Sequence, residues 1–268
     1  MPNIDKSLSE EKPNYYCLKV GDMDKVRTVF KQLVRDWSSA GAEERNSSYK
    51  PVIDEIENLF PQQDRDKISI LVPGAGLGRL AWELSSRGFS CQGNEFSLYM
   101  LIPSYFVINF TIKPYLSQTT NVFSREDQLA SVSIPDVDPS CISGNNGPFS
   151  MAAGDFLDVY TQPDTFNCVA TVFFLDTAHN LLDYLENIAL ILKPGGYWIN
   201  LGPLLYHFFD MPGEFSMEFS YEEIRTFAFK MGFKLIKEET DHKCSYTQNP
   251  KSMIQNQYSC VFSVWQKQ

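Results

Sequence analysis

A glycine-rich turn set between two strands is the feature that most constrains how this chain folds. The apolar run 68–72 predicts a buried strand, and Gly74, Gly76 and Gly78 follow it directly. Glycines let the backbone turn sharply and lie close against a ligand because no β-carbon intervenes. After an amphipathic helix and a second strand comes Glu95, near the ~20-residue offset at which doubly wound folds place the acid that binds a ribose. The order predicts half of a nucleotide pocket rather than a merely structural turn.

The spacing of the glycines indicates which nucleotide binds. The turn is G-x-G-x-G, whereas dinucleotide enzymes carry G-x-G-x-x-G, and the chain contains no G-x-x-x-x-G-K-[ST] phosphate loop. This pattern disfavours NAD and ATP. It favours S-adenosylmethionine, whose methionine end is a zwitterion and whose ribose is free to meet Glu95. An LKPGG turn at 192–196, followed by a buried strand at 197–201, is typical of methyltransferases at this position.

Hydrophobic patterning predicts an α/β fold in one main domain. Helical apolar spacing marks 22–37 and 44–60, and about seven mostly parallel strands follow. We expect a Rossmann-like seven-stranded methyltransferase sheet with helices on both faces. The predicted strands are 68–72, the segment before Glu95, 149–152, 166–175, 197–201, 233–239 and 257–266. The predicted parts are a disordered tail at 1–21, an N-terminal helical segment at 22–66 and the methyltransferase domain at 67–268, with a long surface insertion at 111–148.

Local signals place further helices. Ser220 with Glu223 three residues later is a capping box, and it opens a helix that should end near Gly232. The segment 180–192 should form the helix ahead of the LKPGG turn. The apolar segment 96–110 is also expected to be helical, with an interruption at its proline.

Charge and cysteine usage bound the functional class. The 268 residues carry 23 Lys and Arg against 33 Asp and Glu, a formal charge of −10, which argues against a nucleic-acid partner. The six cysteines form no C-x-x-C pair, which fits reduced thiols in a cytoplasmic or nuclear protein. No signal peptide and no membrane-spanning apolar run is expected. Histidines and cysteines lack metal-ligand spacing, so no metal is predicted.

Several long strings resemble the carnosine N-methyltransferase family. They are PGAGLGRLAWE, QGNE, AGDF, DTAHN and INLGPLLYH, and the resemblance runs from about Met23 to the C-terminus. It implies a seven-stranded methyltransferase fold and transfer of a methyl group from S-adenosylmethionine to the imidazole of carnosine, giving anserine. Related histidine dipeptides would be alternative acceptors.

The resemblance also implies two sets of site residues. Cofactor contacts would be Gln32, Arg35, Gly74, Gly76, Glu95, Asp155, Phe156 and Cys168. Substrate contacts, taken as the catalytic group, would be Asp176, His207 and Tyr258. The chain departs from the family in its shorter N-terminal region and in the tyrosine-poor sequence Gln255-Asn256-Gln257 before Tyr258. The oligomeric state stays open, with a homodimer as one alternative.

Asp176 ends an apolar strand, where a carboxylate is costly unless it has a partner. It could simply cap the following helix. Alternatively it could accept the N–H of an imidazole substrate, fix the tautomer and stabilise the imidazolium that forms as the other nitrogen is methylated. No strong base is then needed, and positioning would carry most of the catalysis.

Other candidates also have two interpretations. His207, within the apolar LLYHFF, is either a site residue or a packed core histidine. Arg35 either neutralises the carboxylate of the cofactor or pairs with Asp36. Tyr206, Tyr246 and Tyr258 either wall the substrate pocket or fill the core. Two rival functions remain: methylation of histidine within a protein, and a catalytically silent cofactor-binding scaffold.

Overall fold

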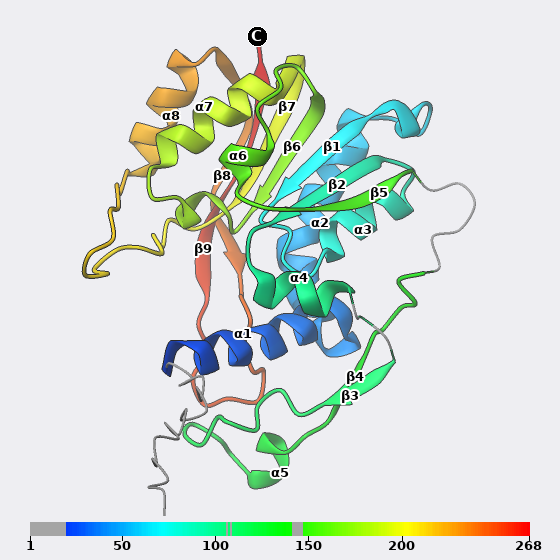
Figure 1. Ribbon diagram of the computed structural model, residues 1–268, viewed down its shortest axis with the longest axis vertical. Helices are drawn as coiled ribbons and strands as arrows, with labels where there is room; N and C mark the ends of the chain where they lie inside the picture. Colours follow the sequence, from blue (N-terminus) through cyan, green and yellow to red (C-terminus); the bar gives the residue numbers. More distant parts are fainter. Residues whose placement is uncertain (1–19, 106, 108, 141–146) are drawn as a thin grey trace, which may run out of the picture.

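Seven strands form one sheet in the computed structural model, which describes residues 20–105, 107, 109–140 and 147–268. The strand order is β5-β2-β1-β6-β7-β9-β8 (Figure 1). All neighbouring strands pair in parallel except β9, which is antiparallel to both β7 and β8. The predicted mostly parallel, seven-stranded sheet is confirmed. The strands are β1 Ser69–Pro73, β2 Ser90–Glu95, β5 Phe149–Ala153, β6 Phe166–Val172, β7 Leu192–Gly202, β8 Phe233–Cys244 and β9 Tyr258–Lys267.

Helices cover both faces of this sheet, and each face has its own core. On one face, α2 (Ala42–Leu59) and α3 (Arg79–Ser86) pack against β1, β6, β7 and β9. On the other, α6 (Phe156–Val159), α7 (Leu181–Ile191) and α8 (Tyr221–Lys230) surround Trp198 and Trp265, which stack with ring centroids 5.9 Å apart. Strands buried on both faces explain why their sequences are continuous apolar runs rather than alternating ones.

The N-terminal helix α1 (Val20–Trp37) lies across one end of the sheet (Figure 1). Of the predicted tail at 1–21, residues 1–19 lie outside the described residues, and the last two open this helix. The insertion packs against α1 through a small third core that includes Ile112 and Ile134. Its described part contains the antiparallel pair β3 (Phe110–Ile112) and β4 (Val132–Ile134) and the short helix α5 (Arg125–Gln128). The insertion is therefore more than an irregular surface segment.

Helix ends follow the predicted signals. Ser220 and Glu223 form both bonds of a capping box at the start of α8, and Gly232 adopts a φ of 87° beyond its end. Asn180 caps α7, because its side chain accepts the N–H of Leu182. The LKPGG segment is a bulged start of β7 rather than a separate turn: Leu192 pairs with Phe166 and Tyr197 with Cys168. Helix α4 (Leu98–Tyr105) contains Pro103 in its last turn and ends two residues later.

The strand directions bring distant parts of the chain to one edge of the sheet. Because β8 runs parallel to β7, its last residue lies at the same edge as the carboxyl ends of β1, β2 and β6. The connection 245–257 and the start of β9 lie there too, and the connection extends past α1 (Figure 1). Ligands of doubly wound sheets bind at this edge.

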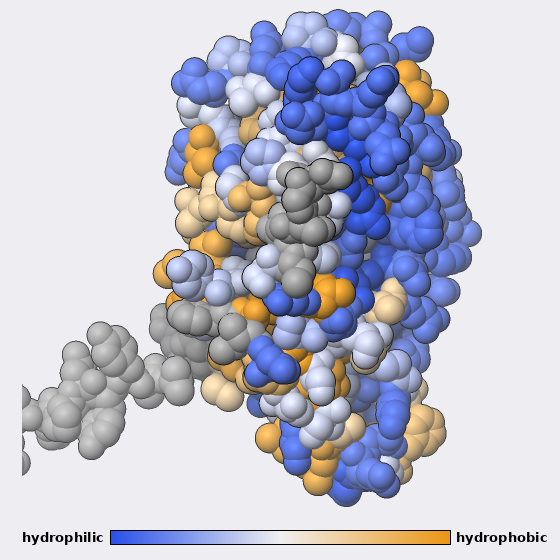
Figure 2. All heavy atoms as spheres, turned by 90° about the vertical axis from the view of Figure 1, so that its right-hand side faces the viewer, coloured by the Kyte–Doolittle hydropathy of each residue, from blue (hydrophilic) through white to orange (hydrophobic). Residues whose placement is uncertain are grey.

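Exposed apolar side chains gather beside this edge, on α4 and on the insertion. Figure 2 shows a face that is largely hydrophilic in its upper right part, with hydrophobic groups in its lower part and along its left side. None of the described helices is both long enough and apolar enough to span a bilayer. The most exposed large apolar residues of this region are Phe96 just before α4, Leu98, Ile102 and Tyr105 on α4, and Leu116 and Phe123 on the insertion.

Candidate active site

The glycine turn after β1 is shaped as its sequence predicts. Gly74, Gly76 and Gly78 all have positive φ, at 64°, 56° and 82°. At Gly74 a β-carbon would also lie 2.5 Å from the ring of Phe174. A larger residue is therefore excluded both by the backbone conformation and by this contact. A β-carbon at Gly76 would meet only the tips of Gln32 and Arg35, at 3.7 and 4.0 Å. The turn therefore presents its backbone to an open space bounded by those two side chains.

Glu95, at the end of β2, fastens this turn. Its Oε2 accepts the N–H of Gly76 at 2.9 Å, and its Oε1 accepts the N–H of Ser97 at 2.8 Å. Burial raises the pKa of Glu95, while the N–H bonds from Ser97 and Gly76 act in the opposite direction. Each carboxylate oxygen has a further lone pair, so the side chain can still accept hydroxyl groups from a ligand.

A cavity of about 440 Å³ lies along the turn and reaches from α1 to α6. It brings together seven of the eight predicted cofactor residues: Gln32, Arg35, Gly74, Gly76, Glu95, Asp155 and Phe156. Asp155 caps α6 by accepting the N–H of Leu157 at 2.8 Å. Cys168 stands apart, because it is fully buried in β6 between β1 and β7 and does not line the cavity. Its predicted contact has no support from this geometry.

Arg35 pairs with Asp36, as one of its two interpretations predicted, and its contact with the cofactor carboxylate stays a prediction. It lines the cavity, and its guanidinium contacts both oxygens of Asp36, at 2.7 and 3.2 Å. Burial opposes the charge of Arg35, but Asp36, Tyr49 and Tyr246 more than offset it and raise its pKa well above the ordinary value. Tyr49 donates to Asp36 at 2.9 Å. The guanidinium is thus held charged and fixed at the wall of the cavity.

The predicted catalytic residues meet in a second, smaller cavity of about 120 Å³. Asp176, His207 and Tyr258 all line it, although they come from three separate segments. The other lining residues are Phe173, Pro203, Leu205 and Tyr246. Phe173, His207 and Tyr246 also line the larger cavity, so the two spaces adjoin.

Asp176 lies in a short 3-10 helix, Leu175–Thr177, and is almost fully buried. Its Oδ2 accepts the N–H of Leu205 at 2.9 Å, and its main-chain oxygen accepts the N–H of His207 at 2.9 Å. Burial raises its pKa, opposed by the Leu205 bond and by nearby His207. The alternative role of helix cap is excluded, because Asn180 caps α7. The carboxylate is held at the wall of the small cavity.

Comparison with known proteins identifies the family of this chain. The family model described as Carnosine N-methyltransferase matches residues 13–268. The chain belongs to this family. It is 48% identical to the carnosine N-methyltransferase of Rattus norvegicus over 256 residues, 92% of this chain and 64% of that protein. It is 44% identical to that of Schizosaccharomyces pombe over 261 residues, 90% of this chain and 70% of that protein. The chain thus spans less than two thirds of the length of the rat relative.

Solved structures share the fold of this family member. The putative methyltransferase of Haloferax volcanii, in complex with the Trm112 methyltransferase activator, is similar with a TM-score of 0.53 and 15% identity, over 90% of this chain and 96% of that chain. A putative sarcosine dimethylglycine methyltransferase from Galdieria sulphuraria gives a TM-score of 0.52 and 13% identity, over 82% and 84%. The Rossmann-like methyltransferase fold is therefore established.

Several cavity residues were missed, or only partly predicted, from the sequence of this family member. Phe173 adopts a φ of 51°, and its ring stacks on Tyr246 at 4.6 Å and meets Tyr258 edge-on at 5.7 Å. Tyr246 was predicted only as one of three candidate wall tyrosines. Tyr206 of that group instead belongs to the core, where its hydroxyl donates to the Phe219 carbonyl at 2.7 Å. Tyr184 was also missed, and stacks on Phe174 at 4.7 Å.

Histidines at the site are not packed core residues. His207 is exposed at the junction of the two cavities, which excludes the core alternative. His179 lines the larger cavity, stacks on Phe208 at 3.5 Å and contacts the Phe215 carbonyl through Nδ1 at 2.7 Å. Of the two, only His207 was predicted at the site, from its position after a strand.

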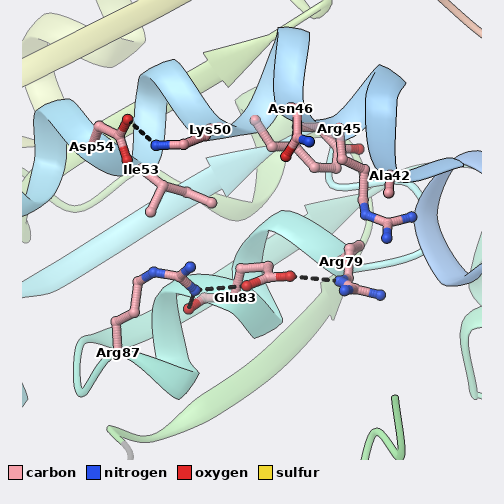
Figure 3. A pocket seen from close by; sticks show the side chains of 10 residues that line it. Ala42, Arg45, Asn46, Lys50, Ile53, Asp54, Arg79, Glu83 and Arg87 are labelled. Carbon is pink, nitrogen blue, oxygen red and sulfur yellow. Dashed lines mark hydrogen bonds and ion pairs between the residues drawn. The ribbon is translucent and has the colours of Figure 1, made fainter. Parts of the chain in front are cut away.

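A third hollow, of about 300 Å³, lies between α2 and α3, and the side chains that line it serve to hold the fold together (Figure 3). Its charged groups are paired with one another or with the insertion. Arg79 contacts Glu83 at 2.9 Å and Asp136 at 2.6 Å, and Arg45 contacts the other oxygen of Asp136 at 2.6 Å. Lys50 is paired with Asp54 on the exposed rim. The ion pairs that line this hollow form a network, which connects the insertion to α2 and α3.

Proposed function

We propose that the protein is an S-adenosylmethionine-dependent N-methyltransferase that methylates an imidazole nitrogen of a histidine dipeptide, converting carnosine to anserine. The observation that carries this proposal is the pair of adjoining cavities. One lies along a glycine turn with an acid at its edge, and the other is a small pocket with a buried carboxylate. Phe173, His207 and Tyr246 border both, so a ring in the small cavity would face the larger one directly.

The larger cavity suits the cofactor at both ends. Gln32 Oε1 is buried and has no hydrogen-bond partner among the residues that the structure describes, and it faces Gly76 beside Arg35. A buried acceptor without a donor is costly, so this atom calls for a donor from a ligand. The ammonium of the methionine group of S-adenosylmethionine would donate to Gln32 Oε1, and the carboxylate of the same group would contact the Arg35 guanidinium. Glu95 would accept the ribose hydroxyls. Bound there, the cofactor supplies a sulfonium methyl group as electrophile.

The smaller cavity suits one aromatic ring. Its volume of about 120 Å³ is on the order of the ~150 Å³ cavity that accommodates benzene in another protein. Faces and edges of Phe173, Tyr246 and Tyr258 offer apolar contact, and Asp176 offers a hydrogen-bond acceptor. The relatives named carnosine N-methyltransferase support an imidazole as that ring.

Asp176 would select the reactive tautomer of the imidazole. A neutral imidazole has one N–H and one lone pair. If Asp176 accepts the N–H, the lone pair is on the nitrogen that faces the larger cavity. As this nitrogen bonds to the methyl carbon, the bond from that carbon to sulfur would break and leave a neutral thioether. Positive charge would then grow on the ring, where the buried carboxylate stabilises it. The N–H proton of the methylated ring would then pass to the Asp176 carboxylate and from there to solvent, so no strong base is required.

A panel of acceptors tests this function. The protein would be incubated with S-adenosylmethionine and carnosine, with other histidine dipeptides and with a folded histidine-containing protein, and the products measured by mass spectrometry. We expect one added methyl on the dipeptides. Methylation of the folded protein alone would favour the protein-directed alternative. Cofactor binding without any transfer would favour the silent scaffold.

A further inference from the structure

Tyr246 is one of the three residues that line both cavities, and its position depends on several contacts. Its ring stacks on Phe173, and the Arg35 guanidinium lies over it at 4.8 Å from the centroid. Gln32 Nε2 donates to its hydroxyl at 2.8 Å. A small displacement of this ring would therefore change both the acceptor pocket and the residues expected to bind the methionine end of the cofactor.

The backbone next to Tyr246 is strained. Thr247 has a φ of 50°, in the left-handed region, which β-branched residues rarely adopt. Such a conformation persists only where surrounding contacts impose it, and it is often found at functional sites. Something outside the turn must hold Thr247 in place.

Glu44 of α2 supplies that contact. Its Oε1 accepts the N–H of Thr247 at 2.5 Å, and its Oε2 accepts the N–H of Gln248 at 3.4 Å. The carboxylate comes from a helix some 200 positions earlier in the chain, and it is half-buried beside Arg35. Neither Glu44 nor Thr247 lines the two cavities of the proposed active site.

The same turn also fixes the strand that carries Tyr258. Gln248 pairs through both ends of its side-chain amide with the backbone of Asn256: its Nε2 donates to the Asn256 carbonyl, and its Oε1 accepts the Asn256 N–H at 2.6 Å. Asn256 lies two residues before Tyr258. Glu44 thus holds one turn, and the positions of both Tyr246 and Tyr258 depend on that turn.

We propose that Glu44 is a positioning residue for methyl transfer: by holding the strained Thr247–Gln248 turn, it sets Tyr246 and Tyr258 against Phe173 around the acceptor ring. For its kinetic consequence this proposal rests on the methyl transfer proposed above. Its structural part, the dependence of a strained turn on one carboxylate, is independent of that activity.

Four variants of the full chain test the proposal: Glu44→Gln, the neighbouring control Glu43→Gln, Thr247→Gly, and Glu44→Gln combined with Thr247→Gly. Glutamine can accept only one of the two N–H groups, and its own NH₂ would face the other. Glu43 is exposed one position away and undergoes the same charge change. Glycine adopts a left-handed φ without strain.

We expect Glu44→Gln to raise the KM for carnosine about tenfold with a smaller change in kcat, and Glu43→Gln to leave both values as in the wild type. Glu44→Gln should lower the urea concentration at the midpoint of unfolding. This decrease should be smaller in the Thr247→Gly background, because glycine adopts the left-handed φ without the strain that Glu44 must otherwise offset. Equal behaviour of Glu44→Gln and Glu43→Gln would overturn the proposal. An equal midpoint loss in both backgrounds would overturn it too.

The two proposals fail separately. If the wild-type protein binds S-adenosylmethionine but methylates no dipeptide, the proposed function fails. The urea midpoints of the four variants then decide whether Glu44 holds the turn. If the wild type methylates carnosine and Glu44→Gln has an unchanged KM, the function stands and the positioning role of Glu44 is wrong.

Discussion

Asp176 combines a buried charge with a proposed catalytic role, so its replacement should affect stability and activity in opposite directions. Burial raises its pKa in the folded state. A carboxyl group whose pKa is raised on folding costs stability as pH rises through that pKa, because the folded state disfavours the charge. Asp176→Asn removes this cost and can still accept the Leu205 N–H.

We therefore expect Asp176→Asn to be more stable than the wild type at pH 7. It should lose this advantage below about pH 4, where Asp176 of the wild type is neutral in both the folded and the unfolded state. Turnover should fall on the order of 10²-fold, as for the loss of other groups that stabilise transition-state charge. Urea unfolding at several pH values and a methyl-transfer assay measure the two effects. Wild-type turnover in the folded variant would contradict the proposed role.

Glu95 should matter for the cofactor more than for the acceptor. Glu95→Gln keeps the shape but replaces one acceptor oxygen by a donor that faces the N–H of Gly76 or Ser97. We expect S-adenosylmethionine affinity to weaken by about 1–3 kcal/mol, measured by calorimetry. Asp158→Asn, an exposed acid on α6, serves as control and should bind normally. Unchanged affinity in Glu95→Gln would refute the assignment.

Single residues could be predicted where chemistry or backbone conformation demands a residue type. Gly74 is needed for its positive φ and its contact with Phe174, and Asp176 is conspicuous as a carboxylate after an apolar strand. Phe173 could not be predicted, because a phenylalanine at positive φ looks like any other residue of an apolar strand. Cys168 was predicted at the cofactor but is enclosed by the core.

At the scale of elements, the two cavities are lined by partly different segments of the chain. The larger one is lined mainly by α1, the glycine turn, the ends of β2 and β5 and the segment after β6, whereas the smaller one is completed by the segment after β7, the β8–β9 connection and the start of β9. Tyr258 lines only the smaller cavity, and His207 lines both. Cofactor binding and acceptor binding should therefore be separable by mutation.

Tyr258→Phe and His207→Ala should lower kcat/KM for carnosine by at least about tenfold, or roughly 1.4 kcal/mol. Tyr258→Phe should leave S-adenosylmethionine affinity within a few-fold, because its hydroxyl does not reach the larger cavity. His207→Ala should have a larger effect on that affinity than Tyr258→Phe. Equal losses of affinity and activity in both variants would contradict the division between the cavities.

Element types and order followed from sequence because periodicity and caps are local signals. The capping box of α8 and the helix before the LKPGG segment are examples. The bulge at the start of β7 was missed, because pairing of Leu192 with Phe166 is a contact between distant segments. The same holds for the insertion, whose Ile112 and Ile134 are buried in a core that they share with residues of α1.

At the scale of the whole molecule, Asp136 connects the insertion to α2 and α3. It contacts both Arg45 and Arg79, and all three side chains are largely buried. Asp136→Asn would leave two buried cations without their shared anion and should cost roughly 3 kcal/mol of unfolding free energy in urea. Asp54→Asn, which breaks the exposed Lys50 pair, should cost less than about 1 kcal/mol. Similar losses in the two variants would show that the insertion is not held by this network.

The central claim is that the two adjoining cavities transfer a methyl group to an imidazole nitrogen. Its most direct test is NMR of the product formed from carnosine and S-adenosylmethionine labelled with ¹³C in the methyl group, using wild type and Asp176→Asn after both are shown to bind the cofactor. We predict the label on one ring nitrogen with the wild type and a rate on the order of 10²-fold lower with the variant. A label on the amino group, or equal rates for the two proteins, would contradict the account.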